Sequence, residues 1–226
     1  MKIKIFLPCR AGSQRIKNKN IKKFHKFKNG LFELKIEQLL KIKNCDEIVV
    51  STNDKKIINI TKKIDKKKIR LDVRPDDLCL STTKTDDLVK YVAKIFEKND
   101  NILWTHVTCP FFDNKDYDKA INKYILNYKK YDCLVGANMV KDFLFNSHKP
   151  INYDFKKSFW PNTQNLKTLY KINNTIFLTN INSYIKLKNR IGKKIFFHEV
   201  EKIKSIDIDY PPDFQLAEKI LLSYDK

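Results

Sequence analysis

The sequence predicts an α/β fold in which a mainly parallel sheet carries helices on both faces. Short apolar segments typical of buried strands alternate along the chain with longer segments whose apolar residues recur at helical spacing. Hydrophobic residues make up 42% of the 226 residues, which is enough for a sizeable core. No internal repeat and no linker-like stretch divides the sequence, so we expect one domain over residues 1–226.

The first two thirds of the chain alternate regularly between the two kinds of segment. The stretch DEIVVS at 46–51 is typical of a short buried strand, whereas Phe32, Ile36 and Leu39 share one helical face. The expected strands cover residues 3–9, 46–51, 69–73, 101–107 and 133–140. The expected helices cover residues 32–40, 55–65, 85–98 and 115–128.

Regular periodicity is lost between residues 141 and 171. This segment contains Trp160, two prolines and many other aromatic residues, so we interpret it as an arm that leaves the sheet. Beyond it we expect a strand over 170–178, a helix over 180–189, and strands near 194–199 and 203–208. A closing helix follows the Pro211-Pro212 pair and carries its apolar face on Phe214, Ala217, Ile220 and Leu221.

Composition argues against several classes of protein. The net charge is +20, but the basic residues are spread over every segment, so we expect an anionic small substrate and no nucleic-acid partner. The five cysteines contain no CxxC pair and show no ligand spacing with the four histidines, which argues against disulfides and a zinc site. No apolar run approaches the roughly 18 residues of a membrane helix. We expect a cytoplasmic protein without a membrane partner.

The stretch LPCRAGSQRIKNKN at 7–20 combines basic side chains with one of only four glycines in the chain. It leaves the carboxyl end of the first expected strand, where α/β folds bind ligands. Backbone N–H groups of a tight loop, together with Arg and Lys, suit phosphate oxygens. Neither GxxxxGK[ST] nor GxGxxG is present. From the residues alone, the stretch is either a phosphate cradle or a solvated basic loop.

A pair of acidic residues lies near the other end of the chain, in the stretch SIDID at 205–209. In a strand, Asp207 and Asp209 would share one face while the two isoleucines face the core. Two carboxylates beside a phosphate site suit a Mg²⁺ (or Mn²⁺) ion that bridges to phosphate. The alternative is an ordinary half-buried strand with a solvated polar face.

Six short segments follow one another in a recognisable order. They are PCRAGS with KN (8–13 and 19–20), VSTND (50–54), RPDDL (74–78), HVTCP (106–110), NNTIF (173–177) and SIDID (205–209). Together they resemble the motifs PARxGSxxxxxKN, VSTDD, RPxxL, QPTSP, NGAIY and SIDID of the CMP-N-acylneuraminate synthetase (acylneuraminate cytidylyltransferase) family. The resemblance covers nearly the whole chain. It implies a Rossmann-like three-layer α/β/α nucleotidyltransferase fold with a protruding dimerisation arm at 141–171.

This resemblance also implies a reaction and its partners. The anomeric hydroxyl of a sialic-acid-like 2-keto sugar acid would attack the α-phosphate of CTP, pyrophosphate would leave, and a CMP-sugar would form. The protein would be a homodimer whose arm reaches the partner's site. The implied catalytic residues are Arg10, Lys19, Asp207 and Asp209, of which the two aspartates would hold Mg²⁺ (or Mn²⁺). The implied nucleotide-binding residues are Arg10, Ala11, Gly12, Ser13, Lys19, Asn20, Arg74, Cys79 and Ser81. The implied substrate-binding residues are His106, Thr108, Gln164, Lys171, Asn173 and Phe177.

Several positions depart from the family motifs, mostly in the half that would bind the sugar. His106 replaces the usual Gln, Asn174 replaces Gly, and Asn53 replaces an acid. Phe112 and Thr163 stand where basic residues are common in the family. The acceptor could therefore differ from N-acetylneuraminate, and 3-deoxy-manno-octulosonate or a non-sialic acid is the nearest alternative. A non-catalytic nucleotide or nucleic-acid binder is the alternative of another class. His106 is either a pocket histidine or a general base.

Overall fold

The computed structural model describes residues 1–64 and 67–224, and these residues form one seven-stranded sheet. The strand order is β3-β2-β1-β4-β6-β5-β7. Strand β6 is antiparallel to both of its neighbours, and the other pairs are parallel, which confirms the mainly parallel α/β sheet. The strands are β1 (Ile3–Pro8), β2 (Glu47–Thr52), β3 (Ile69–Val73), β4 (Asn101–Trp104), β5 (Cys133–Val140), β6 (Leu169–Asn180) and β7 (Ile195–Glu199).

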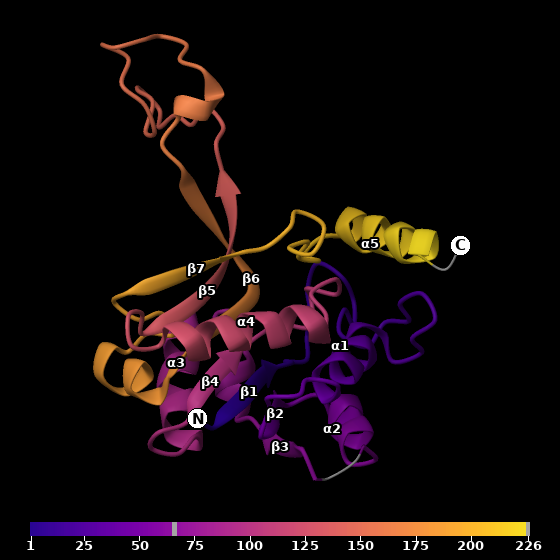
Figure 1. The fold of residues 1–226 in the computed structure, drawn as a ribbon. Helices are drawn as coiled ribbons and strands as arrows, with labels where there is room; N and C mark the ends of the chain where they lie inside the picture. The colour runs from indigo at the N-terminus through magenta and orange to yellow at the C-terminus, as the bar shows by residue number, and fades with distance from the viewer. Residues whose placement is uncertain (65–66, 225–226) are drawn as a thin grey trace.

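Helices cover both faces of this sheet, as Figure 1 shows. One core lies between the sheet and α1, α2, α4 and α5, and a second core lies between the sheet and α3 with the turn that follows β6. The three-layer arrangement predicted from the sequence is therefore confirmed. The helices are α1 (Gly30–Leu40), α2 (Lys55–Thr61), α3 (Thr85–Ile95), α4 (Asn114–Asn127) and α5 (Pro211–Tyr224). Short turns of other helical types occur at Asp76–Cys79, Thr163–Asn165 and Ser183–Leu187.

Strand β1 shows how the sequence pattern builds these two cores. Ile5 and Leu7 belong to the first core, whereas Phe6, between them, belongs to the second, because side chains alternate along a strand. Strand β1 pairs with β2 on one side and β4 on the other. Its carboxyl end is thus held in the middle of the sheet, and the basic loop at 9–29 begins there.

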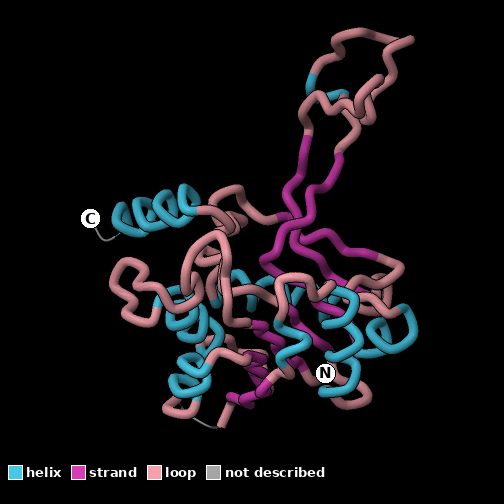
Figure 2. The backbone as a smooth tube through the Cα atoms, turned by 180° about the vertical axis from the view of Figure 1, so that it is seen from behind, coloured by secondary structure: helices cyan, strands magenta, loops and turns pink. Residues whose placement is uncertain are grey.

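An arm projects from the sheet beyond the ends of β5 and β6 (Figures 1 and 2). Its end is a cluster of aromatic rings in edge-to-face contact, among them Phe143, Tyr153 and Trp160. Phe159 and Trp160 are nevertheless 70% and 73% exposed. The protruding segment starts where the loss of periodicity predicts it, after Val140. Strand β6 begins at Leu169, one residue before the strand expected over 170–178, and ends at Asn180, two residues beyond it.

The sequence prediction of a strand over 203–208 is wrong. The segment folds into consecutive turns, in which the N–H groups of Ser205 and Ile206 donate to the carbonyls of Glu201 and Ile203. Ile208 then makes a single backbone contact, from its N–H to the carbonyl of Thr108 at 2.8 Å. Without a neighbouring strand in register no ladder forms, so the argument from alternating faces does not apply to this segment.

Other elements differ from the prediction in their limits. The helix expected over 180–189 is only a π-helical turn, Ser183–Leu187, because β6 continues to Asn180. The helix expected over 55–65 ends at Thr61, and its predicted last residue lies outside the described residues. Strand β4 ends at Trp104, three residues early, which frees residues 105–107 to form a loop. Within the described part of the chain, no helix is long and apolar enough to cross a membrane.

His198 on β7 is a buried histidine that faces the ring of Phe112. Its Nδ1 has no hydrogen-bond partner among the described residues. Burial, with lesser effects from Lys123 and Lys119, lowers the pKa of His198 to about 4. The unfolded chain would protonate it near 6.5. Since the folded pKa is the lower one, the neutral ring stabilises the fold above pH 6.5, and this contribution is lost as the pH falls from 6.5 to about 4.

We therefore expect the free energy of unfolding of the native protein to fall between pH 6.5 and pH 4.5. In His198→Leu the slope should be shallower by up to about 1.4 kcal/mol per pH unit, the value for one proton. Urea titrations at several pH values would measure both slopes. The matched control is His148→Leu, because His148 is exposed on the arm. Equal slopes in the native protein and in His198→Leu would contradict this account.

Candidate active site

A cavity of about 390 Å³ lies at the carboxyl ends of β1 and β4, where the loops that follow these strands meet residues 207–209. This is the edge at which parallel α/β sheets bind ligands. The basic loop and the acidic pair, which lie far apart in the sequence, thus line the same cavity. The lining residues that the sequence predicts are Arg10, Ser13, Lys19, Asn20, Ser81, His106, Thr108, Asp207 and Asp209.

The loop after β1 is held by its own hydrogen bonds. Asn20 donates from Nδ2 to the carbonyl of Arg10 at 3.1 Å. Gly12 has φ +74°, and a Cβ built on it would meet no atom closer than 4.0 Å. The glycine is thus needed for the backbone conformation rather than for space. Arg10 donates to the carbonyls of Ala11 and Gly12 at 3.3 and 3.2 Å, so its guanidinium lies over the loop.

Asn53, after β2, connects this loop to its neighbour. Its Oδ1 accepts from the N–H of Ala11 at 2.9 Å, and its Nδ2 donates to Oδ1 of Asp76 at 2.9 Å. An aspartate at position 53 would present a like charge to Asp76. The asparagine that departs from the family motif therefore suits the acid beside it.

Asp209 is the counter-ion of the basic loop. Its Oδ1 accepts from Arg15 at 3.0 Å and from Lys19 at 3.3 Å. Lys19 also donates to the carbonyl of Ile208 at 2.7 Å, and the guanidinium of Arg15 lies 4.7 Å from the ring centre of Tyr210. These contacts join the C-terminal segment to the N-terminal loop.

Asp207 is the pocket carboxylate best suited to a metal ion. Its Oδ2 accepts from Nδ2 of Asn174 at 2.7 Å, whereas its Oδ1 is buried and has no hydrogen-bond partner among the described residues. A buried carboxylate oxygen without a partner is costly, and a cation bound beside it would remove that cost. The described part of the chain contains no group of three or more His, Cys, Asp or Glu side chains that could hold a metal ion by themselves. The aspartate pair thus fits an ion that takes its other ligands from a bound phosphate and water.

His106 lies between the cavity and the second core. Its Nε2 accepts from Nε1 of Trp104 at 3.1 Å, and NH1 of Arg190 lies 3.4 Å from the same nitrogen. Burial, the Arg190 guanidinium and the Lys19 ammonium lower the pKa of His106 to about 3. A general base needs a pKa near the working pH, so this geometry favours the pocket-histidine alternative.

Arg74 and Cys79 do not line the cavity themselves. Arg74 is 2% exposed and donates from Nε to Sγ of Cys79 at 3.1 Å, and Cys79 is buried as well. They support the segment that ends in Ser81, which does line the cavity. Their implied role as nucleotide contacts stays a prediction, and in this structure both side chains lie behind the cavity wall.

The expected substrate-binding residues are less concentrated. Lys171 and Asn173 line a second cavity of about 660 Å³ at the base of the arm, which shares Asn174 and Asp207 with the first. Gln164 is exposed near the end of the arm, outside both cavities. Phe177 is 1% exposed, and the Arg190 guanidinium lies 3.8 Å from its ring centre. The ring thus belongs to the second core in this structure, and the expected contact of Phe177 with the substrate stays a prediction.

Sequence reasoning missed three residues of the site. Arg15 lies within the quoted basic loop, where its spacing does not distinguish it from the other cations. In the sequence Asn174 is only a departure from a motif, and its hydrogen bond to Asp207 is visible only in the folded chain. Arg190 comes from the loop after the π-helical turn, and no local pattern marks it.

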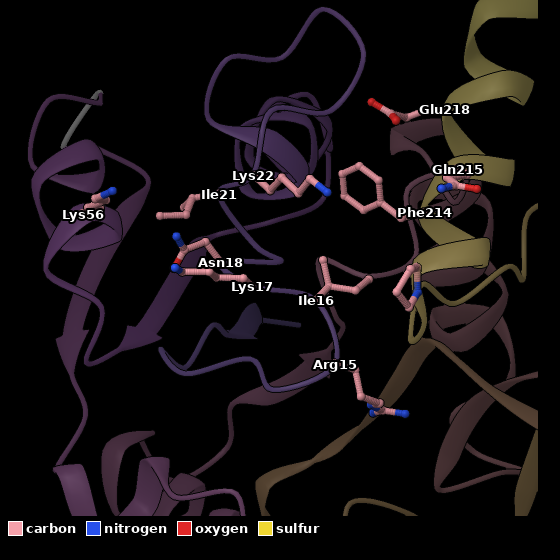
Figure 3. Close-up of a pocket in the computed structure, with 11 residues that line it drawn as sticks. Arg15, Ile16, Lys17, Asn18, Ile21, Lys22, Lys56, Phe214, Gln215 and Glu218 are labelled. Carbon is pink, nitrogen blue, oxygen red and sulfur yellow. The ribbon is translucent and has the colours of Figure 1, made fainter.

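A separate groove of about 640 Å³ lies on the other side of the basic loop, between that loop and α5 (Figure 3). It shares Arg15 and Ile16 with the first cavity but has no aspartate in its wall. Lys22 and Phe214 form a cation–π contact of 4.8 Å across it. The acidic pair distinguishes the 390 Å³ cavity as the candidate active site.

Comparison with known proteins defines the family of this chain. The cytidylyltransferase family matches residues 5–224, nearly the entire sequence. The chain therefore belongs to the cytidylyltransferase family.

Three curated relatives share low identity with the chain. It is 23% identical over 221 residues to the N-acylneuraminate cytidylyltransferase of Escherichia coli O18:K1:H7, covering 96% of this chain and 51% of that protein. It is 28% identical over 167 residues to a pseudaminic acid cytidylyltransferase of Campylobacter jejuni, covering 73% and 66%. It is 25% identical over 234 residues to the CMP-N,N'-diacetyllegionaminic acid synthase of Legionella pneumophila, covering 98% and 97%. The chain thus spans about half of the Escherichia coli relative.

Solved structures show the same fold. A CMP:2-keto-3-deoxy-manno-octonic acid synthetase, in complex with CTP, aligns with a TM-score of 0.69 at 12% identity, over 99% of this chain and 100% of that one. A 4-diphosphocytidyl-2C-methyl-D-erythritol synthase of Anaerococcus prevotii aligns with a TM-score of 0.69 at 17% identity, over 98% of both chains. These similarities confirm the Rossmann-like nucleotidyltransferase fold.

The contact between Asn174 and Asp207 generates a prediction about metal affinity. In Asn174→Ala the Asp207 carboxylate loses the donor that orients it, and we expect Mn²⁺ binding in the presence of CTP to weaken by about 10-fold. Electron paramagnetic resonance of free Mn²⁺ would measure this. The matched control is Asn44→Ala, which removes an exposed contact with Asn122 on the surface and should leave Mn²⁺ binding unchanged. Equal affinities in the two variants would contradict the positioning role.

Proposed function

We propose that the chain transfers CMP from CTP to the anomeric hydroxyl of a sialic-acid-like 2-keto sugar acid, with release of pyrophosphate. One observation carries the proposal: a single cavity at the carboxyl edge of the sheet combines Arg10, Arg15 and Lys19 with the Asp207–Asp209 pair. Membership of the cytidylyltransferase family supports the nucleotide. The names of the relatives, which act on N-acylneuraminate, pseudaminic acid and legionaminic acid, support the class of acceptor.

The proposed chemistry needs charge and position more than a reactive side chain. The acceptor oxygen forms a bond to the α-phosphorus, the bond from that phosphorus to the bridging oxygen breaks, and pyrophosphate leaves while the hydroxyl proton is released. Negative charge on the phosphate oxygens is stabilised by preorganised cations. Arg10, Arg15 and Lys19 supply these, and the N–H groups of the loop around Gly12 are suited to the same oxygens.

A Mg²⁺ (or Mn²⁺) ion is part of the proposal. It would be held by Asp207 and Asp209, and it would supply positive charge to the transferred phosphate. The buried, unpartnered Oδ1 of Asp207 supports its binding there. Asn174 holds the Asp207 carboxylate in place through a hydrogen bond to Oδ2. The other oxygen, Oδ1, would then be available to the metal ion.

The acceptor would lie toward the base of the arm. The cavity there adjoins the active site through Asp207 and Asn174 and is lined by Lys141, Lys171 and Lys202. These ammonium groups suit the carboxylate of a sugar acid.

The oligomeric state and the compartment are also proposed. We place a second copy of the chain against the arm, because Phe159 and Trp160 expose large apolar rings at its end and such rings are enriched in interfaces. We propose the cytoplasm as the compartment, since the reaction consumes CTP. The single domain over residues 1–226, with 141–171 as its dimerisation arm, belongs to the same proposal.

The direct test is pyrophosphate release from CTP in the presence of Mg²⁺, measured with N-acetylneuraminate, legionaminate, pseudaminate and 3-deoxy-manno-octulosonate. We expect release with CTP but not with ATP, GTP or UTP, with at least one nine-carbon acid, and its loss in EDTA. Release only with the eight-carbon acid would replace the acceptor. No release and no CTP binding would overturn the reaction, and oligonucleotide binding tighter than CTP binding would favour a non-catalytic binder.

Two variants test the residues in this reaction. Arg10→Ala should raise the KM for CTP about 10-fold or more, since a charge-assisted contact with phosphate is lost. Lys129→Ala, which removes an exposed cation just beyond α4, is its matched control and should leave that KM unchanged. Asp207→Asn should abolish turnover without altering the circular dichroism spectrum. Near-native values for either site variant would contradict its role.

If the arm forms the dimer contact, substitutions at its end should change the molecular mass of the protein in solution. The native protein should run as a dimer in size-exclusion chromatography with light scattering, and Phe159→Ser/Trp160→Ser should shift it to a monomer. Leu126→Ser on α4 is the control, because Leu126 is 82% exposed but lies away from the arm. A native monomer, or a double variant that remains dimeric, would overturn the arm as the dimer contact.

A further inference from the structure

Two side chains converge on the same ring nitrogen of His106. Trp104 donates from Nε1 to Nε2 of His106 at 3.1 Å, and NH1 of Arg190 lies 3.4 Å from that nitrogen. Trp104 is only 1% exposed and its ring stacks on Tyr184. The guanidinium of Arg190 lies 4.9 Å from the centre of the Trp104 ring and 3.8 Å from that of Phe177. Both donors are therefore held by packing.

Neither donor can accept a hydrogen bond. The indole N–H of Trp and the guanidinium of Arg are donors only. The nitrogen that faces them must therefore carry a lone pair, because a proton on Nε2 would point at two other N–H groups. A neutral imidazole carries its proton on the other nitrogen. The surroundings of His106 thus define its tautomer by chemistry, without any hydrogen being observed.

The other nitrogen, Nδ1, is not engaged by the described residues. His106 lines the 390 Å³ cavity together with Thr108 and Asp207. Among the described residues Nδ1 has no hydrogen-bond partner, and it is not one of their buried unpartnered atoms. An N–H at this position is available to a bound molecule.

We propose that Trp104 and Arg190 are positioning residues that hold His106 as a neutral ring with its proton on Nδ1, and that this N–H donates to an oxygen of the bound sugar acid. The inference rests on the proposed function for the identity of the ligand. It makes His106 a specificity-determining donor that cannot accept the acceptor's hydroxyl proton. Arg190 acts only through His106.

This assignment differs from what a glutamine at position 106 would do. The amide nitrogen of an asparagine is bonded to Cγ, as Nδ1 of histidine is, whereas the amide of glutamine lies one bond farther out, near the position of Nε2. Asparagine can therefore supply an N–H where His106 supplies it, and glutamine would place its amide against Trp104 and Arg190. We therefore expect His106→Asn to preserve binding of the sugar acid better than His106→Gln, although glutamine is the usual residue in the family motif.

The charges that face His106 predict little response to pH. Arg190 and Lys19 oppose protonation of the ring, and Asp209 favours it to a smaller extent. We therefore expect the donor to persist throughout the range in which the protein is folded and active.

The first test observes the tautomer in the full chain without substrate. Nitrogen-15 spectra of histidine-labelled protein, with His106 assigned by the loss of its signals in His106→Asn, should show a protonated Nδ1 and an unprotonated Nε2 from pH 5 to pH 9. In Arg190→Met, which keeps an apolar chain but loses the charge, His106 should titrate at a higher pH than in the native protein. Lys186→Met, which changes an exposed residue of the π-helical turn before Arg190, should behave like the native protein. A protonated Nε2, or a titration unchanged by Arg190→Met, would overturn the assignment.

The second test measures kinetics with the best acid of the panel. His106→Asn should keep the KM for the sugar acid within about 3-fold, whereas His106→Gln and His106→Leu should raise it by about 10-fold or more. The KM for CTP should stay the same in all three. Equal values for Asn and Gln, or a loss of kcat with an altered pH profile, would overturn the donor role. If the native protein turns over no acid, the proposed function fails, while the nitrogen-15 spectra still decide the tautomer.

Discussion

The charge balance around the loop after β1 is the constraint on which the site depends. Arg15 and Lys19 share the Oδ1 of Asp209 at 3.0 and 3.3 Å. Without that carboxylate, cations this close would repel one another, and Lys19, whose side chain is only 13% exposed, would lack a charged partner. The C-terminal segment is therefore held against the N-terminal loop, and the cavity exists because they meet.

Two residues that depart from the family motifs are each explained by an acidic neighbour in the folded chain. Asn53 donates to Asp76 while it accepts from the loop, and Asn174 donates to Asp207. In each pair an amide supplies the N–H that a carboxylate needs, where an acid or a glycine would supply none. When the sequence is compared with the family motifs position by position, these two residues count only as mismatches. In the folded chain they are the contacts that fix a loop and a carboxylate.

The sequence predicts most strands of the sheet well because they are built from local signals. Each buried strand is a continuous apolar run and each helix has its own periodic face, as with the strand over 133–140, which the structure reproduces at both ends. The sequence predictions fail where tertiary contacts, and not local sequence, determine the structure. Residues 203–208 look like a strand but have no neighbour to pair with, and only one backbone bond joins Ile208 to Thr108. Arg190 joins the site through a turn whose position depends on the completed second core.

The residues proposed for the nucleotide lie together in one chain. The residues proposed for the acceptor are spread from the base of the arm outward. The cations of the loop after β1 and the aspartate pair line one cavity of a single chain, which is where the proposed function places the nucleotide. The acceptor side offers Lys171 and Asn173 at the base of the arm, and Gln164 lies far out along it. In the proposed dimer, Gln164 would reach the substrate of the other copy. In the proposed reaction, recognition of the sugar acid within one chain would depend on the lysines at the arm base and on the proposed N–H of His106, and both would favour oxygens that accept hydrogen bonds.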